Sequence, residues 1–332
     1  MKAATLNKYD KNKIDLTITE VNKPVIKADE VLVKLTAAGV NPLDNMISRG
    51  EIKLIKNYKL PLIAGNELVG VVEAVGAGVT KFKVGDRVFA RLPLAKIGAF
   101  AQYAAVASHA LAKVPDYLTD IEAAAVPLTA LTVMQALELM QVTAGKTIFI
   151  SGGTGGVGAM AIPLAKAKGL TVVTNGNGRN RQQVLDLGAD RFIDYKQEDY
   201  TKVLAEVDYV LDTLGGKHTA KQMTILKAGG QLVSLRGLPN GEFAKRMHFS
   251  KGKKLLFTLA GYRLDRLAAR HQVKYHFIFV ESNGDQLQEV ADIFTKLKVK
   301  PLIDTVYPFE QVNQALDKVA NGHSRGKTVL SF

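Results

Sequence analysis

The chain has 332 residues, of which 47% are hydrophobic and 23% charged, and it contains no cysteine. This length and balance fit a globular protein of two domains and exclude a disordered chain, and the lack of cysteine excludes disulfides, thiolate metal ligands and cysteine nucleophiles. The formal net charge is +13, which would suit nucleic acid or a membrane surface.

The basic residues are spread through the chain rather than gathered in one large patch. The densest cluster, Lys245–Lys254, is short and contains few aromatic side chains that could stack on bases. We interpret the charge as a solvated basic face that draws in an anionic cofactor. The sequence shows no apolar signal segment at Met1–Lys11 and no uninterrupted apolar run that would span a bilayer, so we expect a cytoplasmic protein with no nucleic-acid or membrane partner.

The first third of the chain has the pattern of β-strands. Asp15–Glu20 alternates apolar and polar residues, and Glu30–Leu35 and Leu68–Val75 are β-branched runs between turns. Val84–Phe89 reads as a turn that leads into another strand. These runs predict a compact, barrel-like β domain.

From Ile121 the pattern changes to alanine-rich helix, and from Lys146 strands alternate with helices. The strand candidates of this part are Lys146–Ile150, Leu170–Thr174, Arg191–Ile193, Tyr209–Asp212 and Gln231–Leu235. Such alternation predicts a parallel sheet wound by right-handed crossovers, which makes the whole chain an α/β protein.

The C-terminal part returns to mixed elements. An apolar strand at Phe277–Val280 is expected at the end of the sheet, where a second copy could pair with it to form a homodimer. The following elements are expected to be a helix at Asp285–Lys298, a strand at Leu302–Tyr307, a helix at Glu310–Ala320 and a strand at Lys327–Leu330. We place the first domain at 1–123, completed by 300–332, and the second domain at 124–299.

The glycine-rich run Ser151–Gly158 lies between the predicted strand at Lys146–Ile150 and a helical run at Ala159–Lys168. Glycine permits the sharp turn and lets backbone amides approach a ligand. Because the helix directs unpaired amides and the positive end of its dipole at the turn, this run predicts a pyrophosphate site. Glycine-rich turns that bind nothing are the alternative.

The turn after the next strand, Asn175–Arg181, indicates which dinucleotide would bind. NAD-binding folds place Asp or Glu about 20 residues beyond the glycines, to accept a hydrogen bond from the ribose 2′-hydroxyl. Here no acidic residue occurs between Gly158 and Asp186, and the turn carries Arg179 and Arg181. Guanidinium groups suit a 2′-phosphate, so the sequence predicts NADPH; the alternative is that both arginines start a solvated helix.

Several ordered motifs resemble the zinc-free branch of the medium-chain dehydrogenase/reductase superfamily, the quinone oxidoreductases and the similar plant-type enone and alkenal reductases. The matching segments are Gly39–Asp44, Gly65–Gly70, Val84–Val88, Pro127–Thr132, Gly153–Gly158, Leu187–Asp190 and Gly326–Leu330. The resemblance covers essentially the whole chain. It implies a GroES-like catalytic domain, closed by the C-terminal tail, with a Rossmann domain between.

The chain also departs from the pattern of that family. Zinc-dependent relatives carry His where this chain has Asn66, and they need cysteine at other ligand positions. The six histidines are His109, His218, His248, His271, His276 and His323, and none are spaced i, i+4. Met46 stands where quinone reductases often have Tyr, and Asn180 where they have a phosphate-binding Lys. No metal site is expected.

Carried over residue by residue, the resemblance implies contacts with both cofactor and substrate. The implied cofactor-binding residues are Thr132 at the nicotinamide, Thr154, Gly155, Gly156 and Val157 at the pyrophosphate, Asn175, Asn177 and Arg179 at the ribose phosphate, Tyr195, Leu214 and Gly237 at strand ends, and Lys327 from the tail. Asn41 and Asp44 are implied at the substrate cleft, where Asn41 could bind the substrate oxygen and Tyr58, Lys56, Lys59 or water could deliver a proton.

We therefore predict a zinc-independent, NADPH-dependent oxidoreductase that reduces quinones or the C=C bond of α,β-unsaturated ketones and aldehydes by hydride transfer. One alternative is a reductase of enoyl thioesters. The other is a nucleic-acid-binding protein on the same fold, which salt-dependent retention without NADPH consumption would reveal.

Overall fold

The computed structural model describes residues 1–322 and 326–332, which form two compact units. Unit 1 contains Met1–Leu131 and Glu281–Phe332, and unit 2 contains Thr132–Val280. The domain boundaries expected from the sequence, at 123/124 and 299/300, remain predictions. Helix α10 (Gly284–Leu297) lies in unit 1, where the Lys113 amide donates a hydrogen bond of 3.1 Å to Oε1 of Gln288 on this helix.

Unit 1 is built on two sheets. A seven-stranded sheet has the order β15-β16-β3-β5-β6-β8, with β7 paired to β3, and a three-stranded sheet has the order β2-β1-β4. The strands are β1 (Lys2–Leu6), β2 (Thr17–Glu20), β3 (Glu30–Val40), β4 (Leu62–Ile63), β5 (Glu67–Val75), β6 (Arg87–Arg91), β7 (Tyr103–Ala107), β8 (Leu111–Lys113), β15 (Ile303–Pro308) and β16 (Lys327–Ser331). The β-rich first third expected from the sequence is confirmed.

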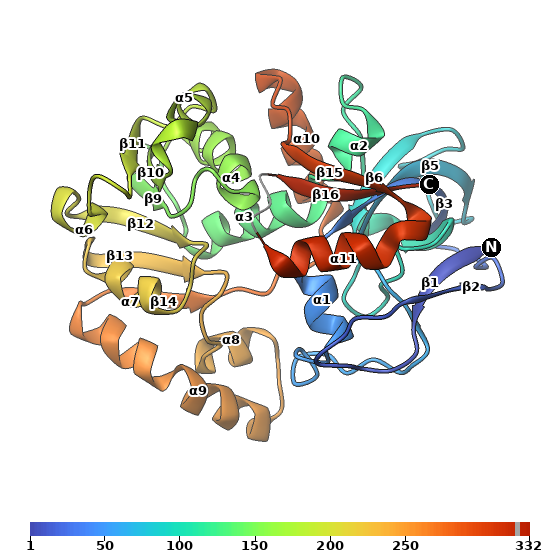
Figure 1. Ribbon diagram of the computed structural model, residues 1–332, viewed down its shortest axis with the longest axis horizontal. Helices are drawn as coiled ribbons and strands as arrows, with labels where there is room; N and C mark the ends of the chain where they lie inside the picture. The colour runs from blue at the N-terminus through green and yellow to red at the C-terminus, as the bar shows by residue number, and fades with distance from the viewer. Residues whose placement is uncertain (323–325) are drawn as a thin grey trace. The chain divides into compact units, whose positions relative to one another are not determined.

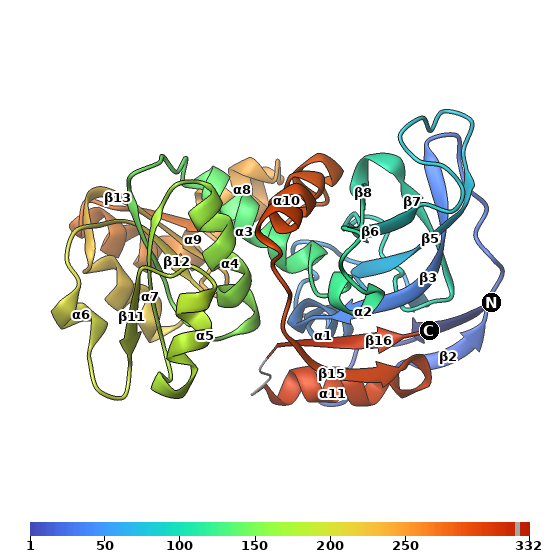
Figure 2. The same cartoon turned by 90° about the horizontal axis from the view of Figure 1, so that it is seen from above.

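The C-terminal tail completes the larger sheet of unit 1. Strand β16 pairs antiparallel with β3, with Val329 opposite Gly39, and β15 pairs parallel with β16 on its other side (Figure 2). Apolar residues of β3 and β5, such as Val33 and Leu68, are fully buried in one hydrophobic core of unit 1. This pairing brings the start of β16 to the end of β3, where the polar cluster described below is formed.

Four further helices lie wholly or partly in unit 1. These are α1 (Pro42–Ser48), α2 (Asp120–Ala123), α3 (Pro127–Leu139), which continues into unit 2, and α11 (Val312–Asn321). Among the described residues, Asp120–Leu139 is long and apolar enough to cross a membrane by length and composition, but 67% of its most apolar window is buried inside the protein. This stretch, which contains α2 and α3, is therefore interpreted as part of the protein core.

Unit 2 contains a six-stranded parallel sheet with the order β11-β10-β9-β12-β13-β14 (Figure 1). The strands are β9 (Thr147–Ile150), β10 (Thr171–Gly176), β11 (Arg191–Asp194), β12 (Val207–Asp212), β13 (Leu226–Ser234) and β14 (Lys274–Phe277). The order starts at a central strand, runs outward to one edge and then to the other, as in a Rossmann fold. The predicted wound sheet is confirmed.

The helices of unit 2 are α4 (Gly156–Ala167), α5 (Arg181–Asp186), α6 (Tyr200–Val203), α7 (Lys217–Met223), α8 (Gly241–Arg246) and α9 (Lys251–Arg270). The last strand differs from the expectation: it covers Lys274–Phe277, not Phe277–Val280. Tyr275 and His276 of this strand are buried, whereas Phe279 beyond it is only partly buried. The buried polar His276 interrupts the apolar run by which a strand is recognised in the sequence. Helix α9, with 20 residues, was not predicted at all.

Candidate functional site

The turn between β9 and α4 requires glycine on steric grounds. Gly152 has a φ of +71°, and a Cβ on Gly153 would lie 2.1 Å from Oγ1 of Thr174. A Cβ on Gly158 would lie 2.4 Å from the carbonyl oxygen of Gly152. Larger residues at Gly153 and Gly158 would push the turn away from β10 and away from the first turn of the helix.

The N-terminus of α4 has the properties of an anion site. The helix has 12 residues, its N-cap is Gly155, and no side chain caps it. Its first amides and the positive end of its dipole are therefore left for another acceptor. Such a helix end beside a glycine turn suits the pyrophosphate of a dinucleotide.

A cavity of about 770 Å³ opens at this turn, within unit 2. Its lining comes from the glycine turn, the ends of β10, β11 and β12, and helices α6 and α7: Gly152, Thr154, Gly155, Asn175, Gly176, Tyr195, Lys196, Gln197, Glu198, Asp199, Tyr200, Thr213, Leu214, His218 and Lys221. Tyr195 and Leu214 are 56% and 40% exposed. These apolar surfaces suit a flat ring such as adenine, and Lys196 and Lys221 supply positive charge.

The cavity gathers some of the cofactor residues expected from the sequence. Thr154, Gly155, Asn175, Tyr195 and Leu214 line it. Oδ1 of Asn175 accepts a hydrogen bond of 2.8 Å from the amide of Gly152, and the residue is buried, so this side chain holds the glycine turn in place.

The other expected cofactor residues lie outside the lining. Gly156 and Val157 form the first turn of α4. Oδ1 of Asn177 accepts a hydrogen bond of 3.3 Å from the amide of Arg179, whose side chain is exposed. The remaining two in unit 2 are Thr132 on α3 and Gly237 beyond β13.

A second polar cluster lies in unit 1, where β16 begins and β3 ends. Nζ of Lys327 forms an ion pair with Oε1 of Glu67 and donates a hydrogen bond of 2.6 Å to Oδ1 of Asn41. Nδ2 of Asn41 donates to the same Glu67 oxygen at 2.8 Å. The other oxygen of Glu67 accepts a 2.7 Å hydrogen bond from the amide of Leu128, at the N-terminus of α3. Lys327 therefore belongs to this cluster, together with Asn41.

Asp44 adds a second buried carboxyl group to the cluster. Its two oxygens accept hydrogen bonds of 2.6 Å from Nδ2 of Asn66 and of 2.8 Å from the amide of Asn41. Burial raises the pKa of Asp44 to about 7, although both hydrogen bonds and Lys327 favour the charged form and the nearby charge of Glu67 opposes it. The carboxyl group can therefore gain or lose a proton near neutral pH.

Arg91 and Tyr58 are further buried groups near this cluster. Arg91 is fully buried, and its Nη1 donates a hydrogen bond to the carbonyl oxygen of Leu92. Burial lowers the pKa of Arg91 to about 10, although nearby groups, including Tyr58 and Glu67, oppose this shift. The hydroxyl of Tyr58 donates a 2.8 Å hydrogen bond to the carbonyl oxygen of Leu94, and burial raises its pKa well above the usual value. In this arrangement the Tyr58 proton is already engaged with the backbone. Its expected catalytic role remains a prediction.

Sequence reasoning missed Glu67 as a member of the unit 1 cluster, and His218, Lys196 and Lys221 as lining of the cavity. Glu67 stands at the buried, mostly apolar start of β5, and a buried acid in such a run is a signal that it must have a partner. Of the six histidines, His323 lies outside the described residues. Within 1–322 and 326–332, no three His, Asp or Glu side chains group as metal ligands would.

Comparisons with known proteins agree with this architecture. Residues 27–116 match the family described as alcohol dehydrogenase GroES-like domain, and residues 187–330 match the family described as zinc-binding dehydrogenase. The chain is 32% identical over 355 residues to the mitochondrial NAD(P)H oxidoreductase RTN4IP1 of Danio rerio, covering 100% of this chain and 91% of the relative. It is 31% identical to the chloroplastic NADPH-dependent alkenal/one oxidoreductase of Arabidopsis thaliana, covering 92% of this chain and 73% of the relative.

Solved structures show the same likeness. The quinone oxidoreductase of Coxiella burnetii is 27% identical with a TM-score of 0.83, over 100% of this chain and 99% of that one. The chain therefore belongs to the medium-chain dehydrogenase/reductase superfamily, in its quinone oxidoreductase and alkenal/one reductase group. As a member of this group it is an NAD(P)H-dependent oxidoreductase.

Proposed function

We propose that this protein uses NADPH to reduce quinones or the C=C bond of α,β-unsaturated ketones and aldehydes, without zinc. The observation that carries the proposal is the uncapped N-terminus of α4 at the glycine turn, beside a cavity of about 770 Å³. The names of relatives that act on alkenals and quinones support the substrate class.

The preference for NADPH rests on charge around the turn after β10. No acidic side chain lies in the stretch Asn175–Arg181, and the exposed Arg179 offers a guanidinium group to a 2′-phosphate. Lys196 lines the cavity after β11 and adds a second positive charge. Asp194 works against this preference, because its carboxylate lies close to Gly178 of this turn: a Cβ on Gly178 would lie 2.2 Å from Oδ2 of Asp194.

The bound cofactor would supply the hydride. Once a hydride had added to the β-carbon of the substrate, the resulting enolate would need a proton, so the protein must bind the substrate oxygen and provide that proton. We assign both tasks to the unit 1 cluster. Lys327, with 11% of its side chain exposed, can reach a ligand, whereas Glu67 is fully buried and holds the ammonium in place.

Asp44 and Asn41 support Lys327 in this proposal. Asn41 accepts from the ammonium and donates to Glu67, so its amide fixes the position of Lys327. Asp44, whose carboxyl group has a pKa of about 7, is the group of the cluster that gains or loses a proton near neutral pH, and its charge acts on Lys327.

The same cluster supports independence from zinc. The chain has no cysteine, and the position taken by His in zinc-dependent relatives is Asn66, whose Nδ2 donates to Asp44. The ammonium of Lys327 already lies against Glu67, so a divalent cation there would meet a positive charge. These residues do not fit a zinc ion.

The proposal is tested by the rate of NADPH consumption with simple quinones and short enones, after dialysis against a metal chelator. We expect turnover with NADPH, slower turnover with NADH and no loss of activity after treatment with the chelator. A chelator-dialysed sample that consumes neither cofactor with any substrate, or that regains activity only with zinc, would overturn the proposal.

A further inference from the structure

Helix α9 carries an apolar stripe on its solvent side. Its buried face contains Phe257, Gly261 and Ala268, which pack on unit 2. The exposed stripe consists of Leu255, Leu259 and Tyr262, which are 63%, 67% and 55% exposed, and Leu256 beside it is 45% exposed. At about 100° per residue, Leu255, Leu259 and Tyr262 fall within about 60° of arc, opposite the buried face.

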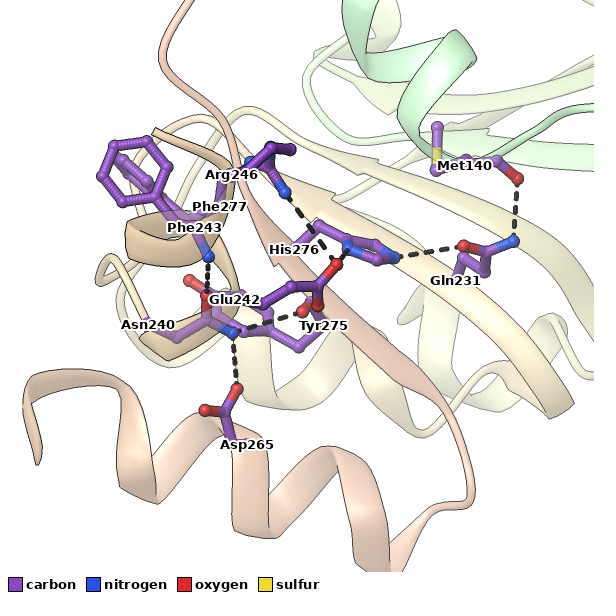
Figure 3. A network of polar contacts seen from close by, with 10 residues as sticks. All are labelled: Met140, Gln231, Asn240, Glu242, Phe243, Arg246, Asp265, Tyr275, His276 and Phe277. Atoms are coloured by element: carbon purple, nitrogen blue, oxygen red, sulfur yellow. Dashed lines mark hydrogen bonds and ion pairs between the residues drawn. The ribbon is translucent and has the colours of Figure 1, made fainter. Parts of the chain in front are cut away.

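The charges around this stripe have one sign. Helix α9 contains six basic residues, Lys251, Lys253, Lys254, Arg263, Arg266 and Arg270, and its single acidic residue is Asp265. Oδ1 of Asp265 accepts a 2.7 Å hydrogen bond from Nδ2 of Asn240, on the inner side of the helix (Figure 3). The outer face therefore presents leucine, tyrosine and cations with no acidic group.

The helix is held firmly by its inner side. Asn240 links α9 to the start of α8, since its Oδ1 also accepts from the amide of Phe243 at 3.0 Å. Helix α8 is joined to β14 through Glu242, whose Oε1 lies 3.1 Å from Nδ1 of His276 (Figure 3). A Cβ on Gly261 would lie 2.4 Å from Cβ of Asn240, so α9 approaches this region as closely as it can. The exposed leucines cannot turn inward without breaking these contacts.

We infer that α9 is a docking surface for an anionic lipid membrane, on which the helix lies parallel to the surface. A long surface helix that presents leucine and tyrosine together with Arg and Lys on its solvent side can lie at the boundary of headgroups and acyl chains, and its cations attract anionic lipid. A second copy of this chain is disfavoured as the occupant, because two such faces would bring like charges together. The sequence predicted no membrane partner, because it contains no apolar run that would span a bilayer; this segment was not recognised as a surface helix.

The chain offers a clean spectroscopic test, because it contains no tryptophan. Leu259→Trp places a single reporter on the stripe, and Leu297→Trp, at a position 48% exposed on α10, serves as the matched control. With vesicles of phosphatidylcholine containing about one third phosphatidylglycerol, we expect a blue shift of tryptophan emission for Leu259→Trp only, lost at high salt. An equal response at both positions, or none at either, would overturn the inference.

Vesicle sedimentation of the full chain gives an independent measure. The double variant Leu255→Gln/Leu259→Gln and the double variant Arg263→Gln/Arg266→Gln should each reduce binding to anionic vesicles by about tenfold or more, whereas Leu297→Gln should not. Pure phosphatidylcholine should bind none of them. Unchanged binding of the double variants would contradict the inference, as would a dimer in light scattering that Leu255→Gln/Leu259→Gln disperses. NADPH turnover in solution should be the same for all variants, so this test stands apart from the proposed function.

Discussion

Nζ of Lys327 donates a 2.6 Å hydrogen bond to Oδ1 of Asn41, although 286 positions separate the two residues in the chain. Both also contact Glu67, which is fully buried. The first residue of the last strand thus neutralises a carboxylate at the start of β5 and fixes the residue that precedes α1. The C-terminal tail is part of the site and not only a closing strand.

Replacing Lys327 by Met should destabilise the protein. It would leave the buried Glu67 carboxylate without its ion-pair partner, a change that typically costs about 3–5 kcal/mol. The free energy of unfolding in urea measures this loss. The double variant Lys327→Met/Glu67→Gln removes both charges and should recover part of the stability, whereas Lys8→Met, at an exposed position, should change little. Equal stabilities of Lys327→Met and the double variant would argue against a buried ion pair.

The raised pKa of Asp44 makes stability depend on pH. Its folded pKa is about 7 against a usual 3.8, so the folded state binds the proton more tightly than the unfolded state does. The stabilisation is therefore complete below about pH 4 and is lost as the pH rises to about 7, by a few kcal/mol at most. Unfolding free energies from pH 4 to 8 should fall less steeply for Asp44→Asn than for the natural chain. Parallel pH profiles would contradict this assignment.

Two glycines of the turn should respond differently to alanine. In Gly153→Ala the new Cβ would meet Oγ1 of Thr174 at 2.1 Å, so we expect a loss of stability of about 1–3 kcal/mol. In Gly155→Ala the nearest atom is the carbonyl oxygen of Gly152, at 3.4 Å, so the fold should tolerate the methyl group. Because Gly155 lines the cavity, this second variant should instead raise the KM for NADPH. Thermal unfolding and steady-state kinetics separate the two effects. If both variants lost only stability, the placement of the cofactor at Gly155 would be wrong.

Arg179→Ala should reduce kcat/KM for NADPH about tenfold or more and leave that for NADH nearly unchanged, because a charge-assisted hydrogen bond to the 2′-phosphate would be lost. Arg181→Ala is the matched control. The guanidinium group of Arg181 lies 5.9 Å from the ring centre of Phe192, so this side chain has a partner within the protein. A larger effect at Arg181 than at Arg179, or an equal loss with both cofactors, would show that the phosphate is bound elsewhere.

The sequence predicted the wound sheet because strand runs such as Thr147–Ile150 are short, apolar and separated by helical segments. It missed helix α9 because apolar residues such as Leu255 and Leu259 lie on its exposed side and Phe257 on its buried side, so its hydrophobicity has little helical periodicity. It misplaced the last strand because His276, buried there with Glu242 and Gln231 as partners, interrupts the apolar pattern.

The glycine turn could be recognised from the sequence because all its parts are neighbours in the chain. The unit 1 cluster could not, since Asn41, Glu67 and Lys327 meet only after β3, β5 and β16 have paired. The expected roles of Asn41 and Asp44 came from family resemblance alone. Their dependence on Glu67 is a property of the folded sheet.

The most direct test of the account is a titration of NADPH into the chelator-treated protein, followed by the fluorescence of the reduced nicotinamide. We predict saturable binding at one site per chain, unchanged by added zinc and weakened by Gly155→Val, whose bulk would fill the approach to the helix N-terminus. Binding that requires zinc, or that Gly155→Val leaves intact, would contradict the central claim that the turn before α4 holds the cofactor.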